Sequence, residues 1–470
     1  MNRIEFVTDV PRQHLCTSCG GCVGICPRDA LTMVATLEGT LAPSVDESKC
    51  NLCGLCLRVC PGYEIDVPGF QKKLFGELPA QPGIGNFLHL YAGTAVDNTI
   101  RQISQSGGVV SALLIYLLES GKIKGAIVTR WSKDDPLRPE TYIARTREAI
   151  LDAVGSKYCP VPAAAMMKQL FREEGKFVFV GTSCQIHALR KAAEIRSELQ
   201  EKILAYFGLY CLGVFNTHFF DFILGKKGIA RGDVKYFESR SKQWRGWPGD
   251  MRIETHSGHI INIPLIDSKL TPRPYFTPWR CTICPDKLNE LSDISFGDCR
   301  IGRIHNQDLQ AFPLREAKLG QSDIICRTSI GHAILKEGVA ADVIQVQTIK
   351  SSEVFRTAGV GEKKLALVNL KILSRLLRRA FPVYNVTYSS KPTLKRVVFS
   401  VLHVSSLINS LISFTFYRMM KYPILRQLLQ QCPFQVLRIV TLLHQKTANY
   451  NIFRQVELIA RYHSEEVTNK

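Results

Sequence analysis

The stretches CTSCGGCVGICP, residues 16–27, and CNLCGLCLRVCP, residues 50–61, share the cysteine spacing C-x-x-C-x-x-C-x-x-x-C-P. Each stretch places four cysteines within eleven residues and follows the last one with a proline. Cysteines repeated at such short, regular intervals are typical of metal ligands. The pattern therefore predicts a duplicated thiolate site near the N-terminus.

The composition fits this interpretation. The chain has 470 residues with 46% hydrophobic and 21% charged content, which is sufficient for two or three domains with buried cores. The opening residues, MNRIEFVTDVPRQHLC, contain no apolar run behind Arg3, so we expect no secretory signal and a cytoplasmic location. Thiols stay reduced in that compartment, so sixteen cysteines indicate metal ligation or redox chemistry rather than disulfides.

The spacing is that of bacterial two-cluster ferredoxins, in which the fourth cysteine of each run reaches the other cluster. We therefore assign one 4Fe-4S cluster to Cys16, Cys19, Cys22 and Cys60, and the second to Cys50, Cys53, Cys56 and Cys26. Structural zinc usually takes two cysteine pairs with a longer spacer, which disfavours zinc here. Residues 1–70 are predicted to be a ferredoxin domain. Its glycines are expected to let the backbone pass close to the clusters, at Gly20, Gly21, Gly24 and Gly54.

The central part of the chain has a different pattern. Residues 63–90 carry prolines and glycines without sustained periodicity and are predicted to be a connecting segment. Beyond them, short apolar runs alternate with helical patterns, with strands expected at 125–130, 176–181 and 202–210, and helices at 110–121 and 184–195. This alternation predicts an α/β domain with a largely parallel sheet over residues 85–362. Ligands of such sheets bind at the carboxyl ends of the strands.

Two turns that immediately precede predicted helices contain candidate binding residues. The Ser-Gly-Gly turn at 106–108 suits a phosphate, although such turns also cap helices that bind nothing. The stretch VFVGTSCQIHALRK, residues 178–191, repeats the arrangement and places Cys184 at the start of a helix. A cysteine there is expected to have a lowered pKa, unless it is an inert buried residue.

Together, these motifs resemble the beta subunit of coenzyme F420 hydrogenase/dehydrogenase, with an N-terminal ferredoxin module as in some relatives. The likeness spans about residues 1–350. It is carried by the turn at 106–108, GSKY (155–158), GTSCQ (181–185), YCLGV (210–214) and WRCTICPDKLNELSDISFGD (279–298). This chain has Ser183 where the family usually has proline, and Leu212 where it usually has histidine, which leaves the substrate open.

The resemblance implies an FAD-containing iron-sulfur oxidoreductase in which the flavin couples hydride chemistry to one-electron transfer. Relatives act on a deazaflavin coenzyme, reduce chlorophyll-type pigments or accompany polysaccharide biosynthesis. The partner is thus expected to be a redox protein or a coenzyme. One alternative is an electron-transfer subunit that has no substrate of its own and docks onto a catalytic partner. Another is a non-redox protein that keeps the clusters as a scaffold.

A third 4Fe-4S cluster is expected from four further cysteines, two at the ends of neighbouring predicted strands and two in a C-x-x-C, namely Cys184, Cys211, Cys281 and Cys284. Two cysteine pairs also suit zinc, which stays an alternative. The remaining cysteines are expected in the core, at Cys159, Cys299, Cys326 and Cys432.

The flavin site is expected to use residues from several of these motifs. The pyrophosphate is assigned to Ser106, Gly107 and Gly108, and further cofactor contacts to Gly181, Thr182, Gln185 and Asp298, with Arg280 as a weaker candidate. Lys157 and Tyr158 are predicted to face the cofactor or the substrate, where a lysine would stabilise an anionic flavin ring. Lys157 would otherwise be a solvated loop lysine. His187 is expected to pack inside its helix or to face solvent.

The tail, residues 363–470, contains 17 lysines and arginines against 3 acidic residues, in a chain of formal charge +19. Such asymmetry favours an anionic partner. The stretch RVVFSVLHVSSLINSLISFTFYR, residues 396–418, alternates polar and apolar residues at helical spacing, which indicates an amphipathic helix rather than a membrane span. We expect a basic helical tail that packs on the core or contacts an anionic membrane surface. Nucleic acid is disfavoured, because the basic residues are spread through hydrophobic helices.

Overall fold

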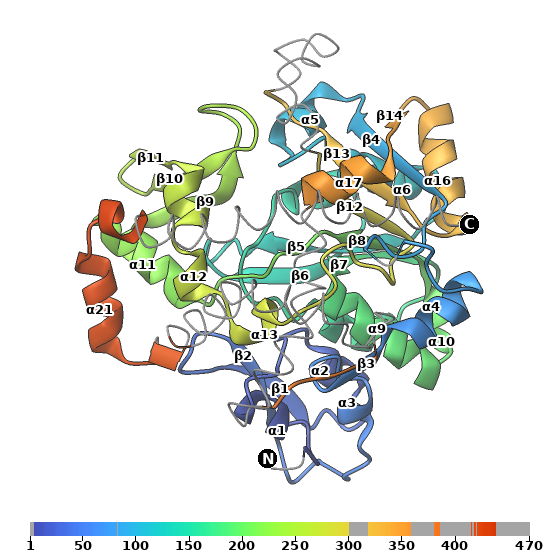
Figure 1. Cartoon of the computed structure of the whole chain (residues 1–470), viewed down its shortest axis with the longest axis horizontal. Coiled ribbons are helices and arrows are strands. Elements are labelled where there is room, and N and C mark those ends of the chain that lie inside the picture. The colour runs from blue at the N-terminus through green and yellow to red at the C-terminus, as the bar shows by residue number, and fades with distance from the viewer. Residues whose placement is uncertain are drawn as a thin grey trace, which may run out of the picture.

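The centre of the molecule is an eight-stranded mixed sheet with helices on both faces (Figure 1). The computed structural model describes residues 4–81, 83–299, 318–358, 380–385, 415, 418–419 and 421–438. Within these residues, the order of the strands across the sheet is β14 (Ile344–Thr348), β4 (His89–Ala95), β13 (Ser322–Cys326), β12 (Ile294–Asp298), β8 (Ile203–Leu209), β7 (Phe177–Thr182), β5 (Gly125–Trp131) and β6 (Pro139–Ala144).

The predicted α/β class is confirmed, and the three predicted strands are β5, β7 and β8. The sheet is nevertheless mixed rather than largely parallel. Only the central strands β12, β8, β7 and β5 pair in parallel, and the outer strands are antiparallel. The short connection from β5 to β6 reverses the chain, and a parallel pairing would need a longer crossover.

The two faces of the sheet have separate cores, because alternate residues of a strand point in opposite directions. Ala126 and Val128 of β5 pack with α6 (Val109–Glu119) and α16 (Ser329–Ala340) on one face. Ile127 packs on the other face with α9 (Ser183–Ile195) and α8 (Met167–Leu170). The helices predicted at 110–121 and 184–195 are therefore α6 and α9, one on each side of the sheet.

The N-terminal module lies against the α9 side of the sheet (Figure 1). It consists of α1 (Asp9–Arg12), α2 (Gly21–Ile25), the hairpin of β1 (Leu31–Ala35) and β2 (Leu41–Val45), and α3 (Leu55–Arg58). Its glycines have a packing role that the sequence did not suggest. A Cβ at Gly20 would lie 2.5 Å from the carbonyl oxygen of Pro162, and one at Gly24 would lie 2.6 Å from that of Ala164. These glycines let α2 press closely against the central domain.

The segment predicted to be a connector is partly regular, so that prediction is wrong. It contains β3 (Glu64–Asp66) and α4 (Val67–Phe75). The Asp66 side chain accepts a hydrogen bond from Gly69 N at 3.2 Å, and Pro68 lies in the first turn, where proline is tolerated. Gly76 ends the helix with a φ of 79°. The prolines and glycines therefore mark the ends of a helix here rather than a loop.

A smaller three-stranded sheet lies beside the main one and carries part of the tail. Its strands are β9 (Val234–Ser241), β10 (Asp250–Thr255) and β11 (Ile260–Ile263), and they pack with α11 (His218–Lys226) and α12 (Arg273–Phe276). Helix α21 (Pro423–Gln431) contacts α11, and Arg438 forms two hydrogen bonds of 2.6 and 2.7 Å with Asp267. This part of the tail is therefore anchored to the central domain.

The tail is not wholly helical, because β15 (Val383–Asn385) pairs in parallel with β3. The amphipathic helix predicted at 396–418 lies almost entirely outside the described residues. No helix in the described part of the chain is both long enough and apolar enough to cross a membrane. The other helical elements among the described residues are α5 (Asn98–Ile103), α7 (Arg147–Asp152), η1 (Ala163–Met166), α10 (Glu198–Lys202), η2 (Arg231–Asp233), η3 (Ile266–Leu270), α13 (Trp279–Thr282) and α17 (Ser351–Ala358).

Candidate metal centres and cofactor pocket

Electrostatic interactions link most of the N-terminal cysteines, in a pattern compatible with the two predicted sets. The thiol of Cys22 interacts electrostatically with those of Cys16, Cys19 and Cys60, which form with it the first cysteine group. Cys56 interacts in the same way with Cys26 and Cys53 of the second cysteine group, to which the sequence also assigned Cys50. Cys22 also interacts with Cys56, so the two groups are neighbours. The first group is largely buried, whereas Cys53 of the second is exposed.

A third cysteine group forms where two parallel strands end. Thr182, the last residue of β7, is in register with Leu209, the last residue of β8. Cys184 lies in the first turn of α9, and Cys211 follows β8. Cys184 interacts electrostatically with Cys211, with Cys284 and also with Cys19 of the first group. Cys281 and Cys284, in and just after α13, interact with the same Arg280 side chain as Cys184 does.

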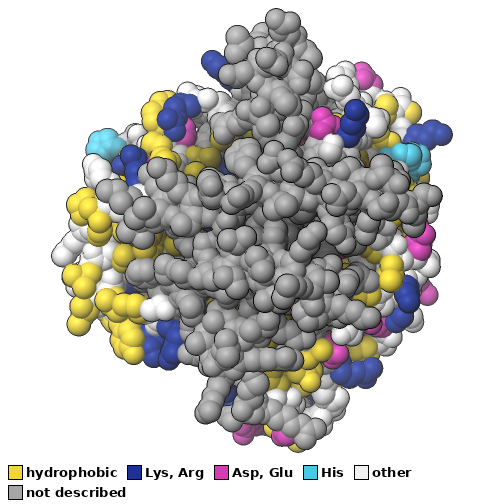
Figure 2. All heavy atoms as spheres, viewed as in Figure 1, with side chains coloured by type: hydrophobic (Ala, Val, Ile, Leu, Met, Phe, Trp, Pro, Cys, Tyr) yellow, Lys and Arg dark blue, Asp and Glu magenta, His cyan; other side chains and the backbone are white. Residues whose placement is uncertain are grey.

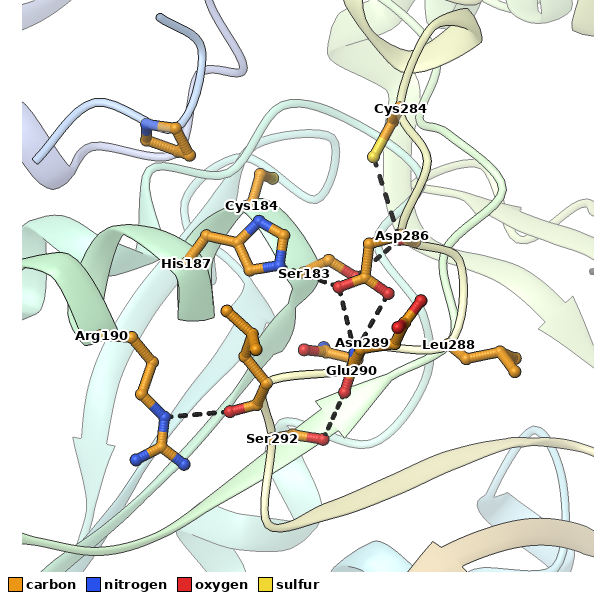
Figure 3. Close-up of polar contacts among 12 residues, drawn as sticks. Ser183, Cys184, His187, Arg190, Cys284, Asp286, Leu288, Asn289, Glu290 and Ser292 are labelled. Atoms are coloured by element: carbon orange, nitrogen blue, oxygen red, sulfur yellow. Dashed lines mark hydrogen bonds and ion pairs between the residues drawn. The ribbon is translucent and has the colours of Figure 1, made fainter. Parts of the chain in front are cut away.

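The loop that follows Cys284 is fastened to the start of α9 by buried hydrogen bonds (Figure 3). His187 Nε2 lies 2.8 Å from Asp286 Oδ2, and Ser183 Oγ donates to the Asp286 carbonyl oxygen at 2.8 Å. Asn289 Nδ2 donates to the Gly181 carbonyl oxygen at 2.9 Å. We expected His187 either to pack inside its helix or to face solvent, and the structure shows it buried and paired with Asp286. These contacts fix Cys284 relative to Cys184.

Burial is the largest influence on the pKa of these thiols. Burial raises the pKa of Cys184 well above its ordinary value, so its place at a helix N-terminus does not lower its pKa as we expected. Burial likewise raises the pKa of Cys22 well above its usual range. A coordinated metal removes the thiol proton outright and offsets this effect. Over the described chain, no three His, Cys, Asp or Glu side chains are grouped to hold a single metal ion.

A cavity of about 340 Å³ opens at the carboxyl ends of the central strands, next to the third cysteine group. Cys211 and the residues after it form one wall, and the first turn of α6 forms another. Among the described residues that line the cavity, one is a carboxylate, Asp298, and five are basic, namely Lys157, Arg240, Lys269, Arg273 and Lys287. The cavity therefore suits an anionic ligand.

Tyr158 is an acid in this pocket whose pKa is lowered by two neighbouring cations. Lys269 Nζ lies 3.8 Å from the centre of its ring, and Arg240 Nη1 lies 3.4 Å from its hydroxyl oxygen. Although burial raises the pKa of Tyr158, these two cations lower it to about 7. Burial lowers the pKa of Lys269 to about 8. Both groups therefore titrate closer to neutral pH than they would in water.

The pocket gathers every predicted cofactor or substrate residue except Gly107 and Arg280. It is lined by Ser106, Gly108, Lys157, Tyr158, Gly181, Thr182, Gln185 and Asp298. A Cβ at Gly107 would instead collide with the Gly93 carbonyl oxygen of β4 and would lie 2.8 Å from Ser322 N of β13. The requirement for glycine at this position therefore comes from strand packing.

Several lining residues are already engaged by the protein. Lys157 Nζ donates to the carbonyl oxygens of Ala153, Val154 and Gly155 at 2.8–3.1 Å, and burial lowers its pKa to about 7. Lys157 is thus neither solvated nor directed at the pocket as a free cation. Asp298 pairs with Arg240 at 2.7 Å, and the Ser106 hydroxyl donates to the Gln321 carbonyl oxygen.

Sequence reasoning missed Arg240, Lys269 and Arg273, which supply much of the positive charge of the pocket. Arg240 lies on β9, and the other two belong to the segment that follows β11. None of them lies in a recognisable local motif. No sequence signal identified them, because they reach the pocket only when the smaller sheet packs beside the main one.

The fold consists of a mixed α/β domain with a basic pocket and an N-terminal module rich in cysteine. Comparison with protein families gives the class of protein. Models of the coenzyme F420 hydrogenase/dehydrogenase beta subunit match residues 90–168 (N-terminal part) and 174–352 (C terminus). A 4Fe-4S dicluster domain model matches residues 15–63. The chain belongs to the coenzyme F420 hydrogenase/dehydrogenase beta subunit family and carries an N-terminal two-cluster 4Fe-4S domain.

Individual relatives agree with this family. The coenzyme F420 hydrogenase subunit beta of Methanosarcina barkeri is 28% identical over 57% of this chain and 84% of its own length. The coenzyme F420-dependent sulfite reductase of Methanocaldococcus jannaschii is 27% identical over 72% of this chain and 49% of its own. A solved chain of the F420-reducing [NiFe] hydrogenase complex from Methanosarcina barkeri aligns at 24% identity with a TM-score of 0.49, covering 66% of this chain and 99% of the solved one.

Proposed function

We propose that this chain is an iron-sulfur flavoprotein oxidoreductase that couples hydride chemistry at FAD to one-electron transfer through 4Fe-4S clusters. The observation that carries the proposal is the basic cavity whose wall includes Cys211 of the third cysteine group. A flavin exchanges two electrons with a hydride donor or acceptor and single electrons with clusters. A cavity that touches a cysteine group is where these two kinds of transfer would meet.

The order of the cysteine groups supports a route from this cavity to the surface. Cys211 lines the cavity, Cys184 of the same group interacts with Cys19 of the first group, and Cys22 interacts with Cys56 of the second. Cys53 of the second group is exposed, and so is its neighbour Leu52, with 75% of its surface accessible. A redox partner protein would exchange electrons there.

Within the cavity, the chain supplies charge and a proton. Lys269, Arg240 and Arg273 would hold the anionic parts of the cofactor or the substrate. Tyr158, with its pKa near 7, would hold or release a proton close to the reacting atoms. The substrate is proposed to be a deazaflavin-type coenzyme, since relatives are named for coenzyme F420.

The test is cofactor extraction after purification without oxygen. We expect one FAD per chain, and we expect Lys269→Gln to weaken flavin binding about tenfold to a hundredfold, because one charge-assisted contact contributes about 1.5–3 kcal/mol. Lys235→Gln is the matched control, because Lys235 is exposed on β9 and does not line the cavity. A chain that carries no flavin under these conditions would contradict the proposal.

Turnover distinguishes the enzyme from the alternative, an electron-transfer subunit that docks onto a catalytic partner, for example in polysaccharide biosynthesis. The relative from Methanosarcina barkeri is named as a hydrogenase subunit, which favours the alternative. Reduction of coenzyme F420 or of an artificial dye by the isolated chain would support its own catalysis. Bound flavin without turnover until a partner is added would support the subunit role.

We also propose that the tail brings the protein to an anionic membrane surface. Four apolar side chains are exposed on α21 and beside it, and they form the α21 patch, namely Tyr422, Ile424, Leu428 and Val436. Figure 2 shows hydrophobic and basic side chains gathered along the left edge of the molecule, where α21 lies in Figure 1. An apolar patch beside cations is the pattern of a helix that binds anionic lipid.

A further inference from the structure

Arg280 joins the first and third cysteine groups. It lies in α13 immediately before Cys281, and only 4% of its surface is exposed. Its Nη2 donates to the carbonyl oxygen of Pro61, which follows Cys60, at 2.9 Å. This buried bond links residues 219 positions apart, each of them next to a cysteine of a different group.

The rest of the guanidinium has few partners. Nε and Nη1 of Arg280 are buried and make no hydrogen bond with the described residues. The ring of Tyr384, from β15, lies 5.0 Å from the guanidinium carbon. Leaving charged N–H groups buried without an acceptor is costly, so a nearby negative charge is required.

Cysteines of both groups surround this charge. Arg280 interacts electrostatically with Cys16 and Cys19 on one side. On the other side it interacts with Cys184, Cys281 and Cys284. The thiolates of two iron-sulfur clusters would supply the negative charge that balances the buried guanidinium.

We propose that Arg280 is a positioning residue shared by the first and third clusters, and that its fixed charge raises the reduction potential of both. This inference rests on the proposed third cluster. In a one-electron transfer between the two groups, the electron lost on one side is gained on the other. Arg280 keeps its proton throughout, because a guanidinium does not deprotonate in proteins.

The physical basis is the charge difference between redox states. Each cluster becomes more negative by one unit on reduction, and a buried cation beside it stabilises the reduced form. Cys53 of the second cysteine group is exposed, so water screens a charge there more strongly than in the buried surroundings of Arg280. The second cluster therefore serves as an internal control in the same molecule.

The test compares Arg280→Gln, Arg280→Lys and the native chain, all purified without oxygen. Iron and sulfide are assayed, and the potential of each cluster is measured by redox titration followed by electron paramagnetic resonance. Arg58→Gln is the matched control, because Arg58 is an exposed arginine of α3 between Cys56 and Cys60.

We expect Arg280→Gln to lower the potentials of the first and third clusters together and to leave the second unchanged. Arg280→Lys should restore most of the shift, and Arg58→Gln should match the native chain. Iron lost in Arg280→Gln but restored in Arg280→Lys would also support a role for the charge.

Three results would overturn the inference. One is an iron-complete Arg280→Gln with native potentials, and another is equal iron loss in both variants, since shape rather than charge would then matter. The third is a native chain with about eight irons, which would also remove the proposed third cluster. The first two results leave that cluster standing, so the two proposals can fail separately.

Discussion

His187 Nε2 lies 2.8 Å from Asp286 Oδ2, and both side chains are buried although 99 residues separate them. The pair joins the helix that carries Cys184 to the loop that follows Cys284 (Figure 3). We expect His187→Ala to destabilise the protein by about 1–3 kcal/mol, because it deprives a buried carboxylate of a partner. It should also lower the iron content of the third group, with the N-terminal clusters retained.

Urea unfolding and iron assays measure these two effects. His256→Ala is the control, because His256 is an exposed histidine beyond β10. Native iron content in His187→Ala would show that this pair does not hold the third group in place.

The third cluster itself is tested by metal content. We expect about twelve irons and twelve sulfides per chain, with four of each in a cubane. Cys281→Ser should remove about four irons and slow the reduction of the N-terminal clusters from the flavin. Cys159→Ser is the control, since Cys159 is a buried core cysteine next to Tyr158. Eight irons and one zinc in the native chain would instead support the zinc alternative.

Tyr158 should titrate near neutral pH. Its pKa falls from an ordinary value of 10.0 to about 7, because Lys269 and Arg240 outweigh the effect of burial. The folded chain then binds fewer protons than the unfolded chain between pH 7 and 10, so the contribution of Tyr158 to stability is lost as pH falls through this window.

Ultraviolet difference spectra against Tyr158→Phe would record the tyrosinate. Lys269→Met should shift the transition to higher pH, because it removes the first of the two cations that lower the pKa. A transition that stays near pH 10 in the native chain would contradict the pocket electrostatics described above.

Gly107 offers a test that separates packing from flavin binding. A Cβ at this position would collide with the backbone of β4, so we expect Gly107→Ala to destabilise the protein by about 1–3 kcal/mol in urea unfolding. Gly232→Ala is the control, because no atom lies within 4 Å of a Cβ there. Native stability combined with loss of FAD would favour our original assignment of Gly107 to the pyrophosphate.

Membrane contact is tested by flotation with anionic vesicles. The full chain should float at low salt and less at high salt, because screening weakens the attraction of a basic tail. Replacing Ile424 and Leu428 of the α21 patch with serine should reduce flotation, since these side chains are 72% and 55% exposed. The same change at Ile330 and Val339, exposed on α16, should have no effect. A native chain that never floats would refute the proposal.

The sequence alone predicted the two-cluster 4Fe-4S domain and several elements of the central domain, and it proposed a ligand set for each cluster. The ligands of a ferredoxin run are set by local spacing, so Cys16 to Cys60 could be assigned without knowledge of the packing. Strands β5, β7 and β8 could be predicted because short apolar runs between turns are a local signal. The prediction for residues 63–90 also relied on a local signal, and it was wrong because prolines and glycines occur at helix ends as well as in loops.

Only the tertiary structure decided which distant residues share a site. Cys184 and Cys211 meet because β7 and β8 are parallel and end at the same edge of the sheet. Arg240 reaches Tyr158 from the smaller sheet, and Lys269 reaches it from the segment that follows that sheet. Lys157 precedes Tyr158 in the sequence, but it donates to backbone carbonyl oxygens instead. Burial and charge partners arise from long-range packing, which residue spacing does not encode. For that reason Arg280, which the sequence linked to the flavin, lies between two cysteine groups instead.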